Sequence, residues 1–158
     1  MADPIDRSGL RPAFWTRPLG DLSTPEWEAL CDGCGKCCLN KLEDDETGEV
    51  ILTRVACRLF DDSTCRCSNY ESRLSHVPEC VVLTPESLPA AAYFMPETCA
   101  YRRLHEGRSL PHWHPLLTGD PDSPHKAGAS LMDETVSETL IHEDDWENFL
   151  VEEPLGNA

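Results

Sequence analysis

The stretch that decides the fold is Cys31-Asp-Gly-Cys34-Gly-Lys-Cys37-Cys38, which gathers four thiols on one short loop. Two-residue gaps between cysteines let successive thiolates converge on one metal ion while the backbone wraps around it. Gly33 and Gly35 fit this wrapping, because glycine readily adopts the unusual φ values that such loops often need. Backbone N–H groups at Gly35 and Lys36 can also point at a sulfur and support it. The motif therefore predicts a metal-binding loop.

Four further cysteines follow between positions 57 and 80, so the loop has partners elsewhere in the chain. Neighbouring side chains diverge in most backbone conformations, and we therefore expect Cys37 and Cys38 to face different partners. Cys37 would complete a site with the two cysteines before it, and Cys38 would turn toward the later group. This arrangement predicts two adjacent metal centres or one polynuclear cluster. The candidate metal ligands are Cys31, Cys34, Cys37, Cys38, Cys57, Cys65, Cys67 and Cys80.

The composition limits both the core and the classes of partner. Leu, Ile, Val and Phe make up only 33 of the 158 residues, which predicts a thin apolar core. The net charge of −16 would repel nucleic acid and anionic lipid, so we expect neither as a partner. No apolar run approaches the roughly 20 residues that span a bilayer. Dense cysteines in a chain with a thin core suggest that something other than oily side chains holds the fold together.

The start of the chain bears on how its cysteines are interpreted. Residues 1–10 show no cationic stretch followed by an apolar run, so we expect no secretory signal and a cytoplasmic protein. In a reducing compartment, clustered cysteines more often bind metal or do redox work than form disulfides. The odd total of nine cysteines would also leave one thiol over in a closed disulfide set. A disulfide scaffold remains the alternative for a mature secreted form whose signal has been removed.

Local patterns predict an irregular α+β fold, a small single domain with short helices and a β-hairpin, stapled by a multi-cysteine metal centre. We expect an extended N-terminal arm over 1–22, a metal-binding domain over 23–142 with its ligand core at 31–80, and an acidic tail over 143–158. Ser23 or Thr24 is expected to cap a helix, with Pro25 at its first position. The remaining expected elements are a hairpin over 39–54 with its turn at 45–48, a helical turn over 69–74, a helix start at 84, a helix over 97–106 and loop over 107–130.

Beyond the cysteine spacing, several stretches of text are shared with a known family. The chain resembles the YkgJ-type CxxCxxCC cysteine-cluster family, in its YcgN branch of bacterial proteins. The resemblance covers about residues 20–150, and implies a domain that chelates zinc or iron through the eight cysteines named above. A related cluster accompanies a flagellin N-methylase, but the resemblance itself supplies no biochemical activity. The matching stretches are Trp27-Glu-Ala-Leu-Cys-Asp-Gly-Cys-Gly-Lys-Cys-Cys38, Val81-Val-Leu-Thr-Pro85, Cys99-Ala-Tyr-Arg-Arg-Leu104 and Trp113-His-Pro-Leu116.

The expected function is metal binding in which zinc or iron is mainly structural and the surface binds another protein. Structural thiolate sites fold small domains by themselves, which favours this interpretation. The alternative is an iron–sulfur redox protein or accessory enzyme domain, because thiolates suit zinc and iron–sulfur clusters alike. Thiol–disulfide chemistry at Cys34 and Cys37 is disfavoured, since Cys31 follows the end of a helix, where the dipole opposes a thiolate. No catalytic residue is identified.

Cys99 and three histidines are the remaining candidate ligands. Cys99 falls in a helix-like stretch beside apolar residues, which favours a buried thiol over a substitute ligand. His112 and His114 flank Trp113, with His125 in a nearby loop. We expect these histidines to be solvated or hydrogen-bonded to backbone, with metal binding as the alternative.

Overall fold

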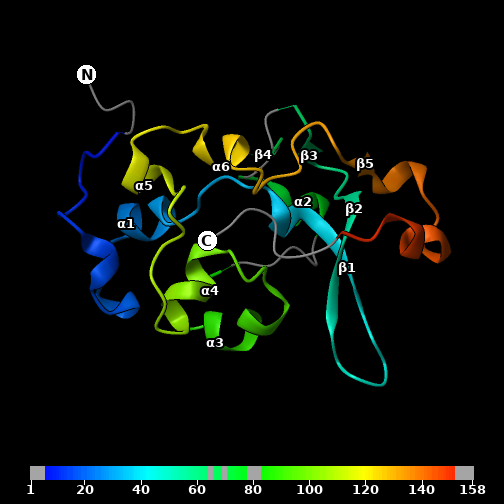
Figure 1. The fold of residues 1–158 in the computed structure, drawn as a ribbon, viewed down its shortest axis with the longest axis horizontal. Coiled ribbons are helices and arrows are strands. Elements are labelled where there is room, and N and C mark those ends of the chain that lie inside the picture. Colours follow the sequence, from blue (N-terminus) through cyan, green and yellow to red (C-terminus); the bar gives the residue numbers. More distant parts are fainter. Residues whose placement is uncertain (1–5, 64–65, 69–70, 78–82, 152–158) are drawn as a thin grey trace. The chain divides into compact units, whose positions relative to one another are not determined.

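The computed structural model describes residues 6–63, 66–68, 71–77 and 83–151. The chain divides into two compact units, each described here by itself. Unit 1 contains residues up to 32 and residues 83–129, and unit 2 contains residues 33–82 and 130–153. The fold is α+β, with short helices and a β-hairpin, as the sequence predicts (Figure 1). Within the described residues, no helix is long and apolar enough to cross a membrane.

Unit 1 is built from short helices. Its α-helices are α1 (Thr24–Ala29), α3 (Leu88–Ala91), α4 (Ala100–His105), α5 (Pro115–Thr118) and α6 (Ser123–Lys126), and its 3-10 helices are η1 (Phe14–Thr16), η2 (Leu19–Asp21) and η4 (Ala92–Phe94). Ser23 caps α1 in a capping box with Glu26, and proline stands in the first turn. This box satisfies two backbone N–H groups that the helix leaves without partners, which explains why the helix begins there.

The apolar core cluster lies in unit 1. Phe14 is 1% exposed, so the segment expected as an extended arm contributes a core residue. Trp27 packs on Tyr101 with ring centroids 4.8 Å apart, and both Trp27 and Leu30, which follows the last residue of α1, are buried. The other buried members are Leu88, Ala92, Ala100, Leu110 and Leu116. This unit therefore has apolar packing of its own.

Unit 2 carries the strands. They are β1 (Leu39–Glu43), β2 (Val50–Ala56), β3 (Phe60–Asp61), β4 (Arg66–Cys67) and β5 (Val136–Ser137), with helix α2 (Arg73–His76) and 3-10 helices η3 (Lys36–Cys38), η5 (Glu138–Leu140) and η6 (Glu143–Phe149). The predicted hairpin is confirmed as the antiparallel pair β1–β2, the long ribbon of Figure 1. Its turn begins at Asp44, whose N–H donates to Glu49, and Gly48 adopts a φ of 73°.

Three strands form the main sheet, in the order β1-β2-β5. β5 joins β2 in parallel, with Val55 opposite Val136. The segment expected as an acidic tail returns to the same strand, because Val151 N–H donates to Leu52 O at 2.8 Å. Trp146 is half-buried, and Val151 is buried. The start of that segment is therefore packed on the sheet of unit 2.

Several expected boundaries differ from the structure. α3 begins at Leu88 and not near position 84, because Thr84 and Ser87 hydrogen-bond to each other across a turn that precedes the helix. α4 begins at Ala100, after a turn in which Cys99 N–H donates to Pro96 O. The loop expected over 107–130 contains α5 and α6, each with proline in its first turn, where a missing N–H costs nothing.

Candidate metal centre

The CxxCxxCC loop begins directly after α1 and turns at its glycines. The N–H of Cys31 donates to Glu28 O at 3.4 Å, so the first cysteine follows the last turn of the helix. Gly33 and Gly35 adopt φ values of 80° and 76°, which confirms the predicted role of glycine in bending this loop. The 3-10 helix η3 then carries Cys37 and Cys38 into β1. By sequence the loop leaves unit 1 after Asp32, and its other three cysteines belong to unit 2.

Cys37 and Cys38 do not diverge as we expect from the sequence. Their thiols are hydrogen-bonded to each other, and this bond is the main cause that raises the pKa of Cys37 well above its ordinary value. Loss of water around the sulfur acts in the same direction, although the residue as a whole is exposed. The difference arises because both residues lie in the tight turn of η3 and not in an extended segment.

The sheet brings Cys38 next to Cys57. Leu39, at the start of β1, is paired with Ala56, at the end of β2. The next residue outward on each strand is a cysteine, and Cys57 N–H donates to Cys38 O at 2.7 Å. The two cysteines therefore lie side by side where the hairpin ribbon ends.

A second, shorter hairpin adds Cys67. Phe60 N–H donates to Cys57 O at 2.8 Å, which closes a tight turn after Cys57. Phe60 is then paired with Cys67 across the antiparallel strands β3 and β4. Backbone hydrogen bonds thus connect three cysteines that are far apart in sequence. Cys65 and Cys80 lie outside the described residues.

Two lysines place positive charge beside this loop in a strongly acidic chain. Lys36, between Cys34 and Cys37, is completely buried. The ammonium of Lys41 donates to Leu39 O at 3.0 Å and to Lys36 O at 3.5 Å. Its charge opposes the upward shift in the pKa of the Cys37 thiol. Lys41 therefore favours the thiolate, which is the form of cysteine that binds metal.

Glu138 supports the same region from the end of β5. Its carboxylate accepts hydrogen bonds from the backbone N–H of Arg58 at 2.8 Å and from the Arg58 guanidinium at 3.2 Å. It also accepts from the side-chain amide of Asn40 at 3.3 Å. Glu138 thus holds the residue after Cys57 and a residue of β1. No local pattern in the sequence marks this role, because Glu138 and Arg58 are 80 residues apart.

The seven cysteines that the structure describes are all thiols, with no disulfide among them. They are Cys31, Cys34, Cys37, Cys38, Cys57, Cys67 and Cys99. Clustered thiols are the donor type that suits zinc and iron. Within the described residues, no three His, Cys, Asp or Glu side chains are close enough together to hold a metal ion. The donor chemistry therefore fits the metal, while the described side chains are not arranged as a complete ligand set.

Cys99 lies in a different setting from the other cysteines. It precedes the first residue of α4, and its side chain packs against the apolar core of unit 1. Burial raises the pKa of its thiol to about 12, and the nearby charges of Cys31 and Asp32 act in the same direction. A thiol with such a pKa stays protonated at neutral pH, which agrees with the predicted buried thiol.

The histidines follow the predicted pattern in part. His114 is fully buried, and both of its ring nitrogens contact backbone: Nε2 donates to Leu30 O at 2.7 Å, and Nδ1 accepts from Leu116 N–H at 3.1 Å. Burial lowers the pKa of His114 despite its bond to Leu30, so the ring is neutral. His112 is exposed and packs edge-on against Trp113, with ring centroids 5.2 Å apart. His125 is half-buried.

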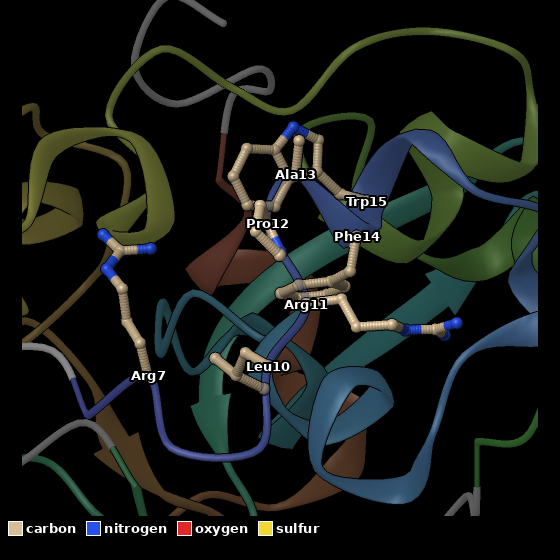
Figure 2. A pocket seen from close by; sticks show the side chains of 7 residues that line it. All are labelled: Arg7, Leu10, Arg11, Pro12, Ala13, Phe14 and Trp15. Atoms are coloured by element: carbon tan, nitrogen blue, oxygen red, sulfur yellow. The ribbon is translucent and has the colours of Figure 1, made fainter.

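A pocket in unit 1 contains none of these cysteines. It has a volume of about 230 Å³ and is lined by Arg7 and by residues 10–15 (Figure 2). The guanidinium groups of its two arginines point away from each other in Figure 2. One of them pairs with the buried Glu26, with Arg11 Nη2 2.7 Å from Glu26 Oε1. This ion pair holds the pKa of the Glu26 carboxyl far below its usual range.

Comparison with known proteins identifies the family. Residues 30–100 match the model of the CxxCxxCC domain, described as a "Putative zinc- or iron-chelating domain". A UPF0260 protein of Rhodobacter capsulatus is 59% identical over 146 residues, which cover 92% of this chain and 98% of that protein. UPF0260 proteins of Caulobacter vibrioides and Marinobacter nauticus are 57% identical over 129 residues (81% of this chain, 79% of that protein) and 53% identical over 139 residues (87% and 93%). No solved structure matches the chain. The chain therefore belongs to the UPF0260 family and carries the CxxCxxCC domain.

Proposed function

We propose that this protein binds zinc or iron through its clustered cysteines and that the metal mainly stabilises the cysteine-rich unit. The observation that supports this most directly is the backbone network joining Cys38, Cys57 and Cys67, all present as thiols. The proposed ligands are the eight cysteines of the spacing pattern: Cys31, Cys34, Cys37, Cys38, Cys57, Cys65, Cys67 and Cys80.

The distribution of apolar packing supports a structural role for the metal. All nine members of the core cluster belong to unit 1. Among its described residues, unit 2 buries several apolar side chains around its three-stranded sheet: Leu39, Leu52, Val55, Ala56, Val77, Leu131 and Val151. These described residues form no part of the core cluster of unit 1, and metal binding to thiolates supplies folding free energy directly. The metal would thus matter most in unit 2.

Location and partners follow from the same chemistry. A reducing compartment such as the cytoplasm suits a protein whose cysteines act as thiolate ligands. We expect the partner to be another protein, because the net charge of −16 repels nucleic acid and anionic membranes.

An iron–sulfur centre is the second candidate. The hydrogen bond between the thiols of Cys37 and Cys38 favours it, because adjacent sulfurs that lie together can serve neighbouring iron atoms of one cluster. Absorption spectra of protein purified without oxygen from iron-replete cells separate the two candidates. A coloured protein with absorption near about 400 nm indicates thiolate-bound iron, and a colourless protein excludes it.

The proposal is tested by elemental analysis of protein purified without oxygen, together with a matched pair of cysteine variants. Cys34→Ser should lose metal and the hydrogen-exchange protection of unit 2, because binding energy is folding energy in such a site. Cys99→Ser should keep the metal, since the raised pKa of that thiol keeps it protonated at neutral pH. A fully folded protein with less than one metal per chain would overturn the proposal. Equal metal loss in both variants would overturn the ligand assignment.

A further inference from the structure

The segment Pro111-His-Trp-His-Pro115 contacts the chain on both sides of Cys31. On one side, Nε2 of His114 donates to the carbonyl of Leu30 at 2.7 Å. On the other side, Nε1 of Trp113 donates to the carboxylate of Asp32 at 3.2 Å. Two neighbouring side chains thus hold the residue before Cys31 and the residue after it. All of these residues belong to unit 1.

These contacts are built from buried groups. Trp113 is 2% exposed, His114 and Leu30 are completely buried, and Asp32 is 8% exposed. Hydrogen bonds between buried groups are costly to break, because neither partner regains water. Cys31 itself is exposed, so the fixed peptide presents an accessible thiol. The segment around Cys31 is therefore held on both sides by buried hydrogen bonds, and Cys31 lies between them on the surface.

The two ring nitrogens of His114 have separate tasks. Nδ1 accepts the N–H of Leu116 in the first turn of α5, which is the role of a helix cap. Nε2 must carry the proton, because its partner is a carbonyl oxygen. The cap fixes the ring orientation, and the fixed ring then aims its N–H at Leu30. The hydrogen bond from Nε2 is the one that holds the chain before Cys31.

We propose that Trp113 and His114 are positioning residues that fix the peptide around Cys31 and thereby limit the positions open to its thiol, one of the proposed metal ligands. This inference rests on the proposed metal-binding function, and it assigns a role to a segment whose two histidines otherwise look like a ligand pair. Hydrogen-bonded supports of this kind orient metal ligands, and their loss typically weakens metal binding by about 10–100-fold.

If Trp113 and His114 only stabilised the fold, the loss of any buried hydrogen bond to α1 or to the residues just after it would have the same effect on metal binding. Tyr101 provides a matched hydrogen bond for this comparison. Its hydroxyl donates to Trp27 O at 2.7 Å, which is also a buried bond from a side chain to a carbonyl of α1. Trp27 lies three residues before Leu30 and does not flank a cysteine. Tyr101→Phe therefore removes a bond of equal length in the same unit without freeing Cys31.

The experiment compares four single variants of the full chain. His114→Asn keeps an acceptor near Nδ1 for the α5 cap but cannot reach Leu30, whereas His114→Gln can place its amide N–H near the position of Nε2. Trp113→Phe keeps an aromatic ring and removes the donor to Asp32. Zinc affinity is measured by competition with a coloured chelator. In metal-stripped protein, the alkylation rate of Cys31 by iodoacetamide is measured by peptide mass, with Cys67 as the internal reference.

We expect Trp113→Phe and His114→Asn to bind zinc about tenfold more weakly than the wild type and to alkylate faster at Cys31. Tyr101→Phe and His114→Gln should stay within about threefold of the wild type in both measurements. If His114→Asn does not fold, the measurements on Trp113→Phe alone test the inference. Wild-type zinc affinity and an unchanged Cys31 rate in Trp113→Phe would overturn the inference. A wild type that binds no metal overturns the proposed function instead, and the alkylation rates still decide whether these residues position Cys31.

Discussion

Glu138→Ala tests whether the support around Cys57 depends on a carboxylate at the end of β5. The carboxylate accepts a backbone N–H of Arg58 at 2.8 Å, which we value at about 1 kcal/mol in a partly exposed place. The ion pair with the Arg58 side chain adds about 0.5 kcal/mol, because that side chain is 41% exposed. The bond from Asn40, at 3.3 Å, adds about 0.5 kcal/mol. We therefore expect a loss of about 2 kcal/mol.

The assay is urea unfolding of the metal-stripped and metal-loaded proteins, followed through the tryptophan signal. A loss of about 2 kcal/mol should also lower the melting temperature by about 4–8 °C in a chain of this size. Arg58→Ala removes only the ion pair and leaves the backbone N–H in place, so it should cost about 0.5 kcal/mol. Glu138→Ala in the Arg58→Ala background should still cost about 1.5 kcal/mol. A cost below about 0.5 kcal/mol for Glu138→Ala would refute the reasoning.

Lys41, His114 and Ala13 each give a further measurable expectation. Lys41→Met should weaken zinc binding by about threefold to fivefold, because the ammonium favours the Cys37 thiolate. Lys41→Arg keeps the positive charge and should retain most of the zinc affinity. Equal losses of affinity in the two variants, measured by chelator competition, would contradict this expectation. Burial lowers the pKa of His114, so the stability that the neutral ring contributes is complete above about pH 6.5. This contribution declines as the pH falls toward the folded-state pKa, by at most about 1.4 kcal/mol per pH unit. In urea unfolding between pH 7.5 and 5, the free energy of unfolding should fall more steeply for the wild type than for His114→Gln, and parallel curves would argue against a neutral buried ring. Ala13→Gly should raise the free energy of unfolding by about 0.5–1 kcal/mol, because Ala13 has a φ of 49°, and a destabilised variant would show that this turn is not strained.

The location of the core changes how the cysteine cluster is understood. From composition, sulfur–metal bonds are expected to replace a missing core throughout the molecule. In the structure, Phe14, Trp27 and Leu30 belong to an apolar cluster that lies within unit 1. Apolar packing of this kind contributes stability without metal. Metal dependence is therefore expected to be strongest in the unit that carries most of the cysteines.

Some features follow from the sequence alone because their causes are local. The capping box of α1, the glycines at 33 and 35 and the β1–β2 hairpin depend on residues close together in the chain. Cap hydrogen bonds, positive φ values and strand alternation act over only a few residues, so a linear pattern reveals them. The CxxCxxCC domain is likewise identified by the spacing of its cysteines, which is itself a linear pattern.

Other features were decided only by the tertiary structure. His114 and Leu30 are 84 residues apart, and Glu138 and Arg58 are 80 apart, yet each pair shares a hydrogen bond beside a cysteine. The contact between the Cys37 and Cys38 thiols arises from the turn of η3, which adjacent positions alone did not reveal. Which buried donor meets which carbonyl depends on how the elements pack, since every helix end and strand edge offers many similar acceptors. The sequence thus indicated which residues are candidate metal ligands, and the packing decided which residues hold the chain around them.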